Sequence, residues 1–142
     1  MKASALLLSS LITFAAGTSI SRPGTPPKPK SPYGVSLHAT IQIAPQNVTR
    51  FIEYAKDIVA TVIQEPLCHF FELYLSAEEP GVISWVENWD ATLEWLVDVQ
   101  LPKEYYKEYL EATEPMYIGP REMTFHNVAG PPFAFYKSWN KK

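Results

Sequence analysis

The chain of 142 residues has a formal net charge of −3, and 46% of its residues are hydrophobic. This length and composition suit one folded domain with its own core and exclude a disordered chain. No cluster of Lys and Arg stands out, so we expect no nucleic-acid partner. The single cysteine, Cys68, excludes a disulfide framework and a thiolate metal cluster within one chain.

The N-terminal residues 1–19 have the layout of a secretory signal peptide. Lys2 precedes an apolar run from Ala3 to Ala16, and small residues follow this run. The run is too short to span a bilayer as a permanent helix. We therefore expect cleavage, a protein that is secreted or lies in the endomembrane lumen, and no membrane association after cleavage.

Residues 20–34 are rich in proline, which predicts an extended linker rather than a part of the core. We place the folded domain at residues 35–128 and an aromatic C-terminal tail at residues 129–142. Near the start of the domain, the sequence Asn-Val-Thr at Asn47 indicates either a glycosylation acceptor or the N-cap of a helix.

Within the domain, hydrophobic periodicity predicts strands and helices in chain order. Residues 35–44 alternate between apolar and polar side chains, as in a strand that is buried on one face. Residues 45–65 repeat apolar side chains at spacings of three and four, as in an amphipathic helix that is closed by Pro66.

The second half of the domain predicts a hairpin, helices and a last strand. Residues 68–76 and 82–89 form two strands joined by an acidic Pro-Gly turn. Residues 90–99 form a short helix that begins at Asp90 as its N-cap, and a further helix follows from Pro102. Residues 121–128 form the last strand.

This order predicts an α+β protein with a ferredoxin-like βαββαβ fold, in which helices cover one face of a four-stranded antiparallel sheet. The apolar face of the first strand should pack on the helices. The opposite sheet face would then expose aromatic side chains, which monomers rarely tolerate over a large area. We therefore predict a homodimer in which two sheets face each other and close a barrel.

Two short motifs and their spacing resemble a known family. Glu65-Pro66-Leu67-Cys68 ends the first helix, and Glu87-Asn88-Trp89 ends the third strand. In this order they resemble the antibiotic biosynthesis monooxygenase (ABM) family of dimeric α+β barrels. The resemblance implies oxygenation of aromatic or polyketide-like hydrophobic substrates in secondary metabolism, with O₂ and without metal, flavin or other cofactor. A deprotonated phenol or anthrone can itself pass an electron to O₂, so the protein needs only a dry slot and a proton acceptor.

Other activities fit the same resemblance, because proteins of this fold include polyketide cyclases, isomerases and decarboxylases. Anthrone-oxidising relatives carry Asn where this chain has Trp85 and Tyr where it has Trp95. Quinol-oxidising relatives carry His where this chain has Asp98 and Lys103. These departures also allow a third hypothesis, a non-catalytic secreted protein that binds a hydrophobic ligand.

The candidate catalytic residues are His38, His126 and Glu87. A His can take a proton from a phenol near neutral pH, and Glu87 can orient that His. By strand parity Trp85, Glu87 and Trp89 share one face, so the two indoles can stack on a planar aromatic substrate.

Three further side chains complete the predicted substrate site. Thr40 and Thr124 share strand faces with the two His residues, and Trp95 follows on the next helix. Either face of the second strand can line the pocket. One face carries Cys68, Phe70, Glu72 and Tyr74, and the other carries His69, Phe71, Leu73 and Leu75. No metal-binding spacing occurs, so we predict no metal site.

Overall fold

The computed structural model describes residues 31–137. The predicted signal peptide at residues 1–19 and most of the predicted linker lie outside the described residues. No helix within residues 31–137 is long and apolar enough to cross a membrane.

Four antiparallel strands form one sheet in the order β2-β3-β1-β4. The strands are β1 (Val35–Gln42), β2 (Cys68–Leu75), β3 (Val82–Trp89) and β4 (Glu122–Asn127). The first and third strands are neighbours at the centre of the sheet, as the ferredoxin-like fold requires. The predicted fold class is therefore confirmed.

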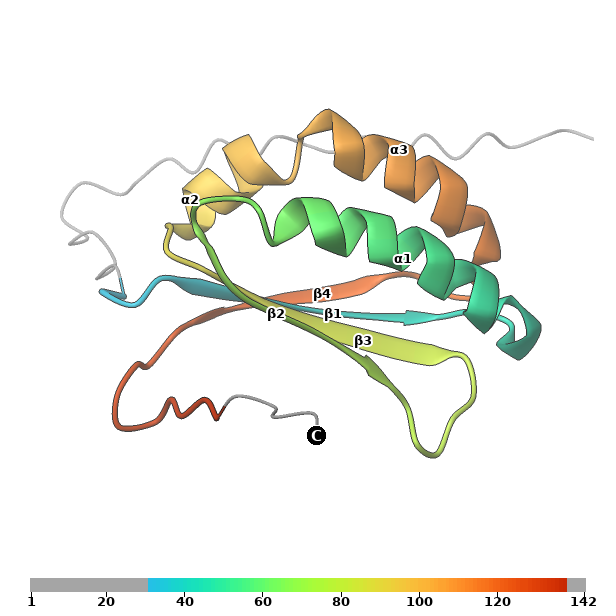
Figure 1. Ribbon diagram of the computed structural model, residues 1–142, viewed down its shortest axis with the longest axis horizontal. Helices are drawn as coiled ribbons and strands as arrows, with labels where there is room; N and C mark the ends of the chain where they lie inside the picture. Colours follow the sequence, from blue (N-terminus) through green and yellow to red (C-terminus); the bar gives the residue numbers. More distant parts are fainter. Residues whose placement is uncertain (1–30, 138–142) are drawn as a thin grey trace, which may run out of the picture.

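All helices lie on one face of this sheet (Figure 1). The 3-10 helix η1 (Pro45–Asn47) leads into α1 (Val48–Val62). The short helix α2 (Leu93–Trp95) continues as the π-helix η2 (Leu96–Gln100). The helix α3 (Glu104–Thr113) and the 3-10 helix η3 (Glu114–Met116) complete this layer.

Asn47 occupies the N-cap position of α1, which was one of its two predicted roles, whereas α2 begins at a different cap from the predicted one. Asn47 directly precedes α1, but its side chain makes no capping hydrogen bond. Thr92, rather than Asp90, caps α2, because its Oγ1 accepts a hydrogen bond of 3.2 Å from the backbone N–H of Trp95. Asp90 directly follows β3, and its backbone N–H donates a hydrogen bond of 2.8 Å to the carbonyl of Leu67, next to the start of β2. The predicted N-cap at Asp90 is therefore wrong.

The helix-facing side of the sheet holds the core. The alternating apolar residues of β1, from Val35 to Ile41, are buried on this side, as predicted. Opposite them on β3, Trp89 pairs with Val35, Glu87 with Leu37, and Trp85 with Ala39. Directly paired residues in antiparallel strands point to the same face of the sheet. The two tryptophans therefore face the helices, and the expectation that they line the open face is wrong.

The open face of the sheet is mainly polar. It carries Ser36 and His38 on β1, Thr124 and His126 on β4, and Phe70 on β2. The segment after β4 passes beneath this face (Figure 1). There the ring of Tyr136 lies 5.4 Å from that of Phe70, between centroids.

Both predicted faces of β2 contribute to the structure. Phe71 and Leu73 pair with Glu87 and Trp85 and so face the helices, whereas Phe70, Glu72 and Tyr74 face the open side. A β-bulge between Cys68 and Phe70 shifts the register by one residue. Cys68 therefore packs against the same core as Phe71, which strict alternation does not predict.

Candidate active site

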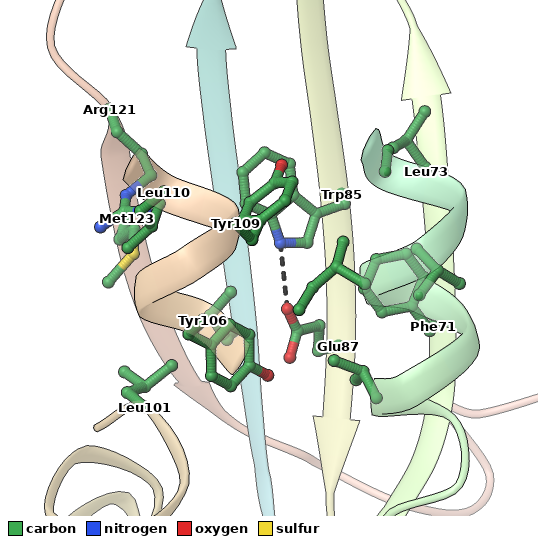
Figure 2. A pocket seen from close by; sticks show the side chains of 15 residues that line it. Phe71, Leu73, Trp85, Glu87, Leu101, Tyr106, Tyr109, Leu110, Arg121 and Met123 are labelled. Carbon is green, nitrogen blue, oxygen red and sulfur yellow. Dashed lines mark hydrogen bonds between the residues drawn. The ribbon is translucent and has the colours of Figure 1, made fainter. Parts of the chain in front are cut away.

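A cavity of about 90 Å³ lies inside the protomer, between the sheet and the helices. Figure 2 shows strands β1 and β3 along one wall and helices α1 and α3 in front of them. Most of the lining is aliphatic or aromatic, which is the lining chemistry of pockets for apolar molecules, but the volume is smaller than in a typical ligand pocket, so a ring system enters only if lining side chains move. The lining residues are Leu37, Ala55, Ile58, Val59, Val62, Phe71, Leu73, Trp85, Glu87, Leu101, Tyr106, Tyr109, Leu110, Arg121 and Met123.

Glu87 places a carboxyl group in this apolar wall, and two indoles hold it. The Nε1–H of Trp85 donates to Oε1 at 3.0 Å, and the Nε1–H of Trp89 donates to Oε2 at 3.0 Å. The side chains of residues 85, 87 and 89 point the same way because strand residues two apart share a face. Glu87 is only 3% exposed, so water does not compete for its carboxyl oxygens, and the two indole hydrogen bonds fix its orientation.

Burial makes Glu87 an unusual acid. Loss of solvation raises its pKa from the ordinary value of 4.5 to about 7, although the hydrogen bonds from Trp89 and Trp85 act in the opposite direction. A carboxyl group with such a pKa exchanges a proton readily near neutral pH. Strongly shifted groups in pockets are typical of functional sites.

Tyr106 brings a hydroxyl to the same part of the cavity. This hydroxyl is buried and makes no hydrogen bond of good geometry within the described residues. Burial and the nearby charge of Glu87 raise the pKa of Tyr106 far above its ordinary value, so it stays a neutral donor. In Figure 2 the Tyr106 hydroxyl points towards the Glu87 carboxyl. A buried donor without a partner is costly unless a ligand or water binds it.

A polar network supports this end of the cavity from the helix side. Oε1 of Glu65 accepts hydrogen bonds from Lys103 Nζ at 2.7 Å and from the Tyr105 hydroxyl at 2.8 Å. Gln100, which is fully buried, donates from Nε2 to Tyr105 at 2.5 Å. The hydrogen bond from Lys103 lowers the pKa of Glu65. These contacts fix η2 and the start of α3, which carries Tyr106, relative to Glu65.

Arg121 contributes the cation of the lining and precedes β4. In Figure 2 its side chain lies beside Leu110 and Met123, at the far end of the cavity from Tyr106. Arg121 takes part in none of the ion pairs found within residues 31–137.

The structure divides the predicted site residues between the two faces of the sheet. Trp85 and Glu87 line the cavity. Trp89 does not line it, but donates a hydrogen bond to Glu87. Trp95 packs on Trp89, with ring centroids 6.2 Å apart, but does not line the cavity. The predicted contact between Glu87 and a catalytic His is wrong, because the sheet separates Glu87 from His38 and His126.

The two His residues form a pair on the open face. Their ring centroids lie 4.6 Å apart. Burial and the neighbouring His126 lower the pKa of His38. His38 contacts Ser36 Oγ at 3.0 Å, His126 contacts Thr124 Oγ1 at 3.1 Å, and Thr40 contacts Ser84 at 3.0 Å. These residues lie next to each other, as strand parity predicted, but away from the cavity.

Tyr106, Tyr109 and Arg121 were not among the predicted site residues. The spacing of Tyr106 and Tyr109 on one helix was the available signal, since residues three apart share a helix face. No local pattern marks Arg121, which reaches the cavity only through the pairing of β4 with β1. Within residues 31–137, no group of three or more His, Cys, Asp and Glu residues is arranged to hold a metal ion.

Comparison with known proteins places this chain in a family. Residues 34–95 match the sequence model of the family "Antibiotic biosynthesis monooxygenase". A protein of Pestalotiopsis microspora named "Putative monooxygenase GME11364" is 36% identical over 93 residues, which cover 66% of this chain and 78% of that protein.

Solved structures share the fold at low sequence identity. A protein from Caulobacter crescentus, described as a "putative antibiotic biosynthesis monooxygenase", has a TM-score of 0.62 and 23% identity over 68% of this chain and 90% of its own. One from Nitrosomonas europaea with the same description has a TM-score of 0.65 and 13% identity over 73% of this chain and 98% of its own. Fold and sequence thus agree, and the chain is a monooxygenase-like member of the antibiotic biosynthesis monooxygenase family.

Proposed function

We propose that this protein is a cofactor-independent enzyme of secondary metabolism that oxygenates a hydroxyaromatic or polyketide-like substrate inside the cavity. The observation that carries the proposal is the buried Glu87 carboxyl, which faces an apolar cavity and has a pKa raised to about 7. The family of the chain supports the oxygenase class of reaction.

Glu87 acts as the proton acceptor in this proposal. Its carboxylate takes the proton of a substrate hydroxyl or of an acidic carbon beside an aromatic ketone. In this proposal the acceptor is Glu87 rather than His38 or His126, because both His residues lie on the opposite sheet face from the cavity.

The two indoles and Tyr106 prepare the site for the resulting anion. Trp85 and Trp89 hold both carboxyl oxygens, so Glu87 need not reorient when the proton arrives. The hydroxyl of Tyr106, which makes no hydrogen bond of good geometry within the described residues, donates to the substrate oxygen as negative charge develops there. Its strongly raised pKa keeps this donor protonated at neutral pH.

Oxygenation then needs no reductant besides the substrate. The electron-rich anion reduces O₂, and an activated CH₂ group becomes C=O while the second oxygen atom leaves as water. The substrate supplies all four electrons, so atoms and electrons balance without metal or flavin. The apolar lining keeps bulk water away from the reactive intermediates.

A second candidate function is a proton-transfer reaction without O₂, such as cyclisation, isomerisation or decarboxylation. The same observation favours it, because a carboxyl with a pKa of about 7 serves any proton abstraction near neutral pH. The third hypothesis, storage or transport of a hydrophobic ligand, requires the cavity but not the charge of Glu87.

The deciding experiment compares turnover of anthrone and naphthol-type substrates by the metal-free protein under air and under nitrogen. Oxygenation predicts product only under air, with one oxygen atom from labelled O₂ in the product. Equal turnover under nitrogen supports the proton-transfer enzyme instead. If Glu87→Gln leaves turnover unchanged in both atmospheres, Glu87 is not the proton acceptor. Ligand binding without any turnover supports the carrier hypothesis.

A further inference from the structure

The polar groups of the cavity have opposite character at its two ends. Glu87 and Tyr106 lie at one end, and Arg121 lies at the other (Figure 2). Glu122, the residue after Arg121, pairs with Thr40, whereas Glu87 pairs with Leu37. Arg121 is thus about four residues further along β1 than Glu87. At about 3.3 Å per strand residue, the two backbone positions are roughly 13 Å apart along the strand direction, and they also lie on opposite sides of β1, about 10 Å apart across the sheet.

Two other cations near this layer have partners of their own. Lys103 forms its ion pair with Glu65 at 2.7 Å, and Arg50 lies over the ring of Tyr54 at 5.9 Å, outside the cavity. Arg121 has no carboxylate partner within residues 31–137. A guanidinium group beside an apolar cavity is well suited to bind a carboxylate through two parallel hydrogen bonds.

The opposite end of the cavity rejects a carboxylate. Glu87 is half ionised at a pH of about 7 and increasingly negative above it, and a second carboxylate beside this charge in an apolar environment would be repelled. A hydroxyl group suits that end, because it can donate to Glu87 and accept from Tyr106 at the same time.

From this polarity we propose that the substrate is a hydroxyaromatic carboxylic acid, bound with its hydroxyl at Glu87 and Tyr106 and its carboxylate at Arg121. The inference rests on the proposed function of the cavity. It adds that the substrate carries a carboxylate and that this carboxylate points towards Arg121. Arg121 is then a specificity-determining residue that selects acids over neutral aromatics of the same shape.

Three naphthalene probes test the inference by calorimetric titration of the full chain at neutral pH. One probe carries only a hydroxyl (naphthol), one only a carboxylate (naphthoic acid), and one carries both at opposite ends (hydroxynaphthoic acid). We expect hydroxynaphthoic acid to bind about tenfold more tightly than naphthol, since a hydrogen-bonded charge contributes at least this factor. We expect Arg121→Gln to remove that preference, so that hydroxynaphthoic acid and naphthol bind this variant about equally.

Two further variants keep the test decisive. Arg121→Lys keeps the charge but loses the two-pronged geometry, so it should retain part of the preference and serves if the Gln variant does not fold. Arg50→Gln removes an equal charge outside the cavity and should retain the full preference. The indole N–H resonance of Trp85, followed by NMR, reports whether each probe enters the cavity.

Failure of the inference is distinguishable from failure of the proposed function. If naphthol shifts the Trp85 resonance but the acid shows no preference, or keeps it in Arg121→Gln, the inference is overturned and the cavity remains a substrate site. If none of the probes shifts that resonance, both the inference and the proposed use of the cavity are overturned.

Discussion

The carboxyl group of Glu87 sits in a part of the core that is otherwise built for apolar side chains. A buried charge is costly in such a place, and the neutral acid is the form that burial favours. The indoles of Trp85 and Trp89 reduce this cost, since each satisfies one carboxyl oxygen. Hydrogen bonds from two tryptophans thus keep one titratable carboxyl group inside the fold.

Glu87 should make the stability of the protein depend on pH. Its pKa is about 7 when folded, against an ordinary value of 4.5, so between these values the folded state binds more protons than the unfolded state. The free energy of unfolding therefore falls as pH rises from 4.5 to 7, by about 3 kcal/mol from this group. Urea unfolding at a series of pH values measures this fall.

Glu87→Gln is the variant that isolates this effect. It cannot titrate, so the difference in stability between it and the wild type should change by about 3 kcal/mol across that pH range. Glu53→Gln, on the exposed side of α1, serves as the control and should keep the wild-type pH dependence. A pH dependence that is identical in wild type and Glu87→Gln would contradict the raised pKa.

Tyr106 should separate function from stability. Tyr106→Phe removes a buried hydroxyl that has no well-formed hydrogen bond, so the free energy of unfolding should stay equal or rise by about 1 kcal/mol. Turnover, by contrast, should fall at least about tenfold, because the developing oxyanion loses its donor.

Tyr109→Phe is the matched control, because Tyr109 lines the same cavity one helix turn away. It should reduce turnover much less than Tyr106→Phe. Equal losses in both variants would mean that Tyr106 has no special role in the reaction.

Among single residues, strand parity correctly predicted that Trp85, Glu87 and Trp89 share a face. It could not predict which face, because moving the pairing of two strands by one residue exchanges the two faces. His38 and Glu87 were grouped on this ground, although the observed pairing of Glu87 with Leu37 separates them.

At the level of elements, the turn between β2 and β3 depends on Gly81. Its φ of 93° lies in the left-handed region, and a Cβ there would collide with the carbonyl group of Ile43. The Gly81 carbonyl accepts a hydrogen bond of 2.9 Å from the N–H of Ile43, which ties the turn to the end of β1. The Pro-Gly turn in the sequence predicted this position well.

Gly81→Ala should therefore lower the free energy of unfolding by more than about 1 kcal/mol. Gly119→Ala is the matched control, since a Cβ at Gly119 meets no atom within 4 Å. Thermal and urea unfolding of both variants check the prediction. An equal effect of the two substitutions would show that the backbone at Gly81 is not a constraint.

The π-helix after α2 is the element that the sequence did not reveal. A regular helix was predicted over residues 90–99, but the N–H of Leu101 donates to the carbonyl of Leu96, five residues earlier, at 2.9 Å. Both Leu96 and Gln100 are buried in this segment. The wider turn brings Gln100 inward to Tyr105, and π-helical turns often occur at functional sites.

At the level of the whole molecule, the cavity is complete within one protomer. We still expect a homodimer, because exposed aromatic side chains gather in the C-terminal tail. Phe133 and Phe135 of the C-terminal tail are each 84% exposed, and they line a surface pocket together with Ser36, His38 and His126 of the open sheet face. Exposed aromatic side chains beside a sheet face that the tail covers only in part favour contact with a second copy.

Thr40→Arg tests this arrangement, because Thr40 is central on the open face. We expect light scattering to give a dimer for the wild type and a monomer for this variant, since two buried guanidinium groups would repel each other. Naphthol binding in the cavity should survive in the monomer. Glu53→Arg, on the exposed side of α1, should remain a dimer; a Thr40→Arg dimer would place the interface elsewhere.

The sequence by itself determined the order of elements, the helix-facing side of β1, the tight turn at Gly81 and the family, because each depends on periodicity, turn chemistry or motif spacing along a short stretch of chain. Only the tertiary structure decided where the site lies. The register of β3 against β1 turned Glu87 towards the helices, and the packing of α3 and β4 brought Tyr106 and Arg121 to the same cavity. Contacts between residues far apart in the chain carry no local pattern, so the site emerged only when the sheet was assembled.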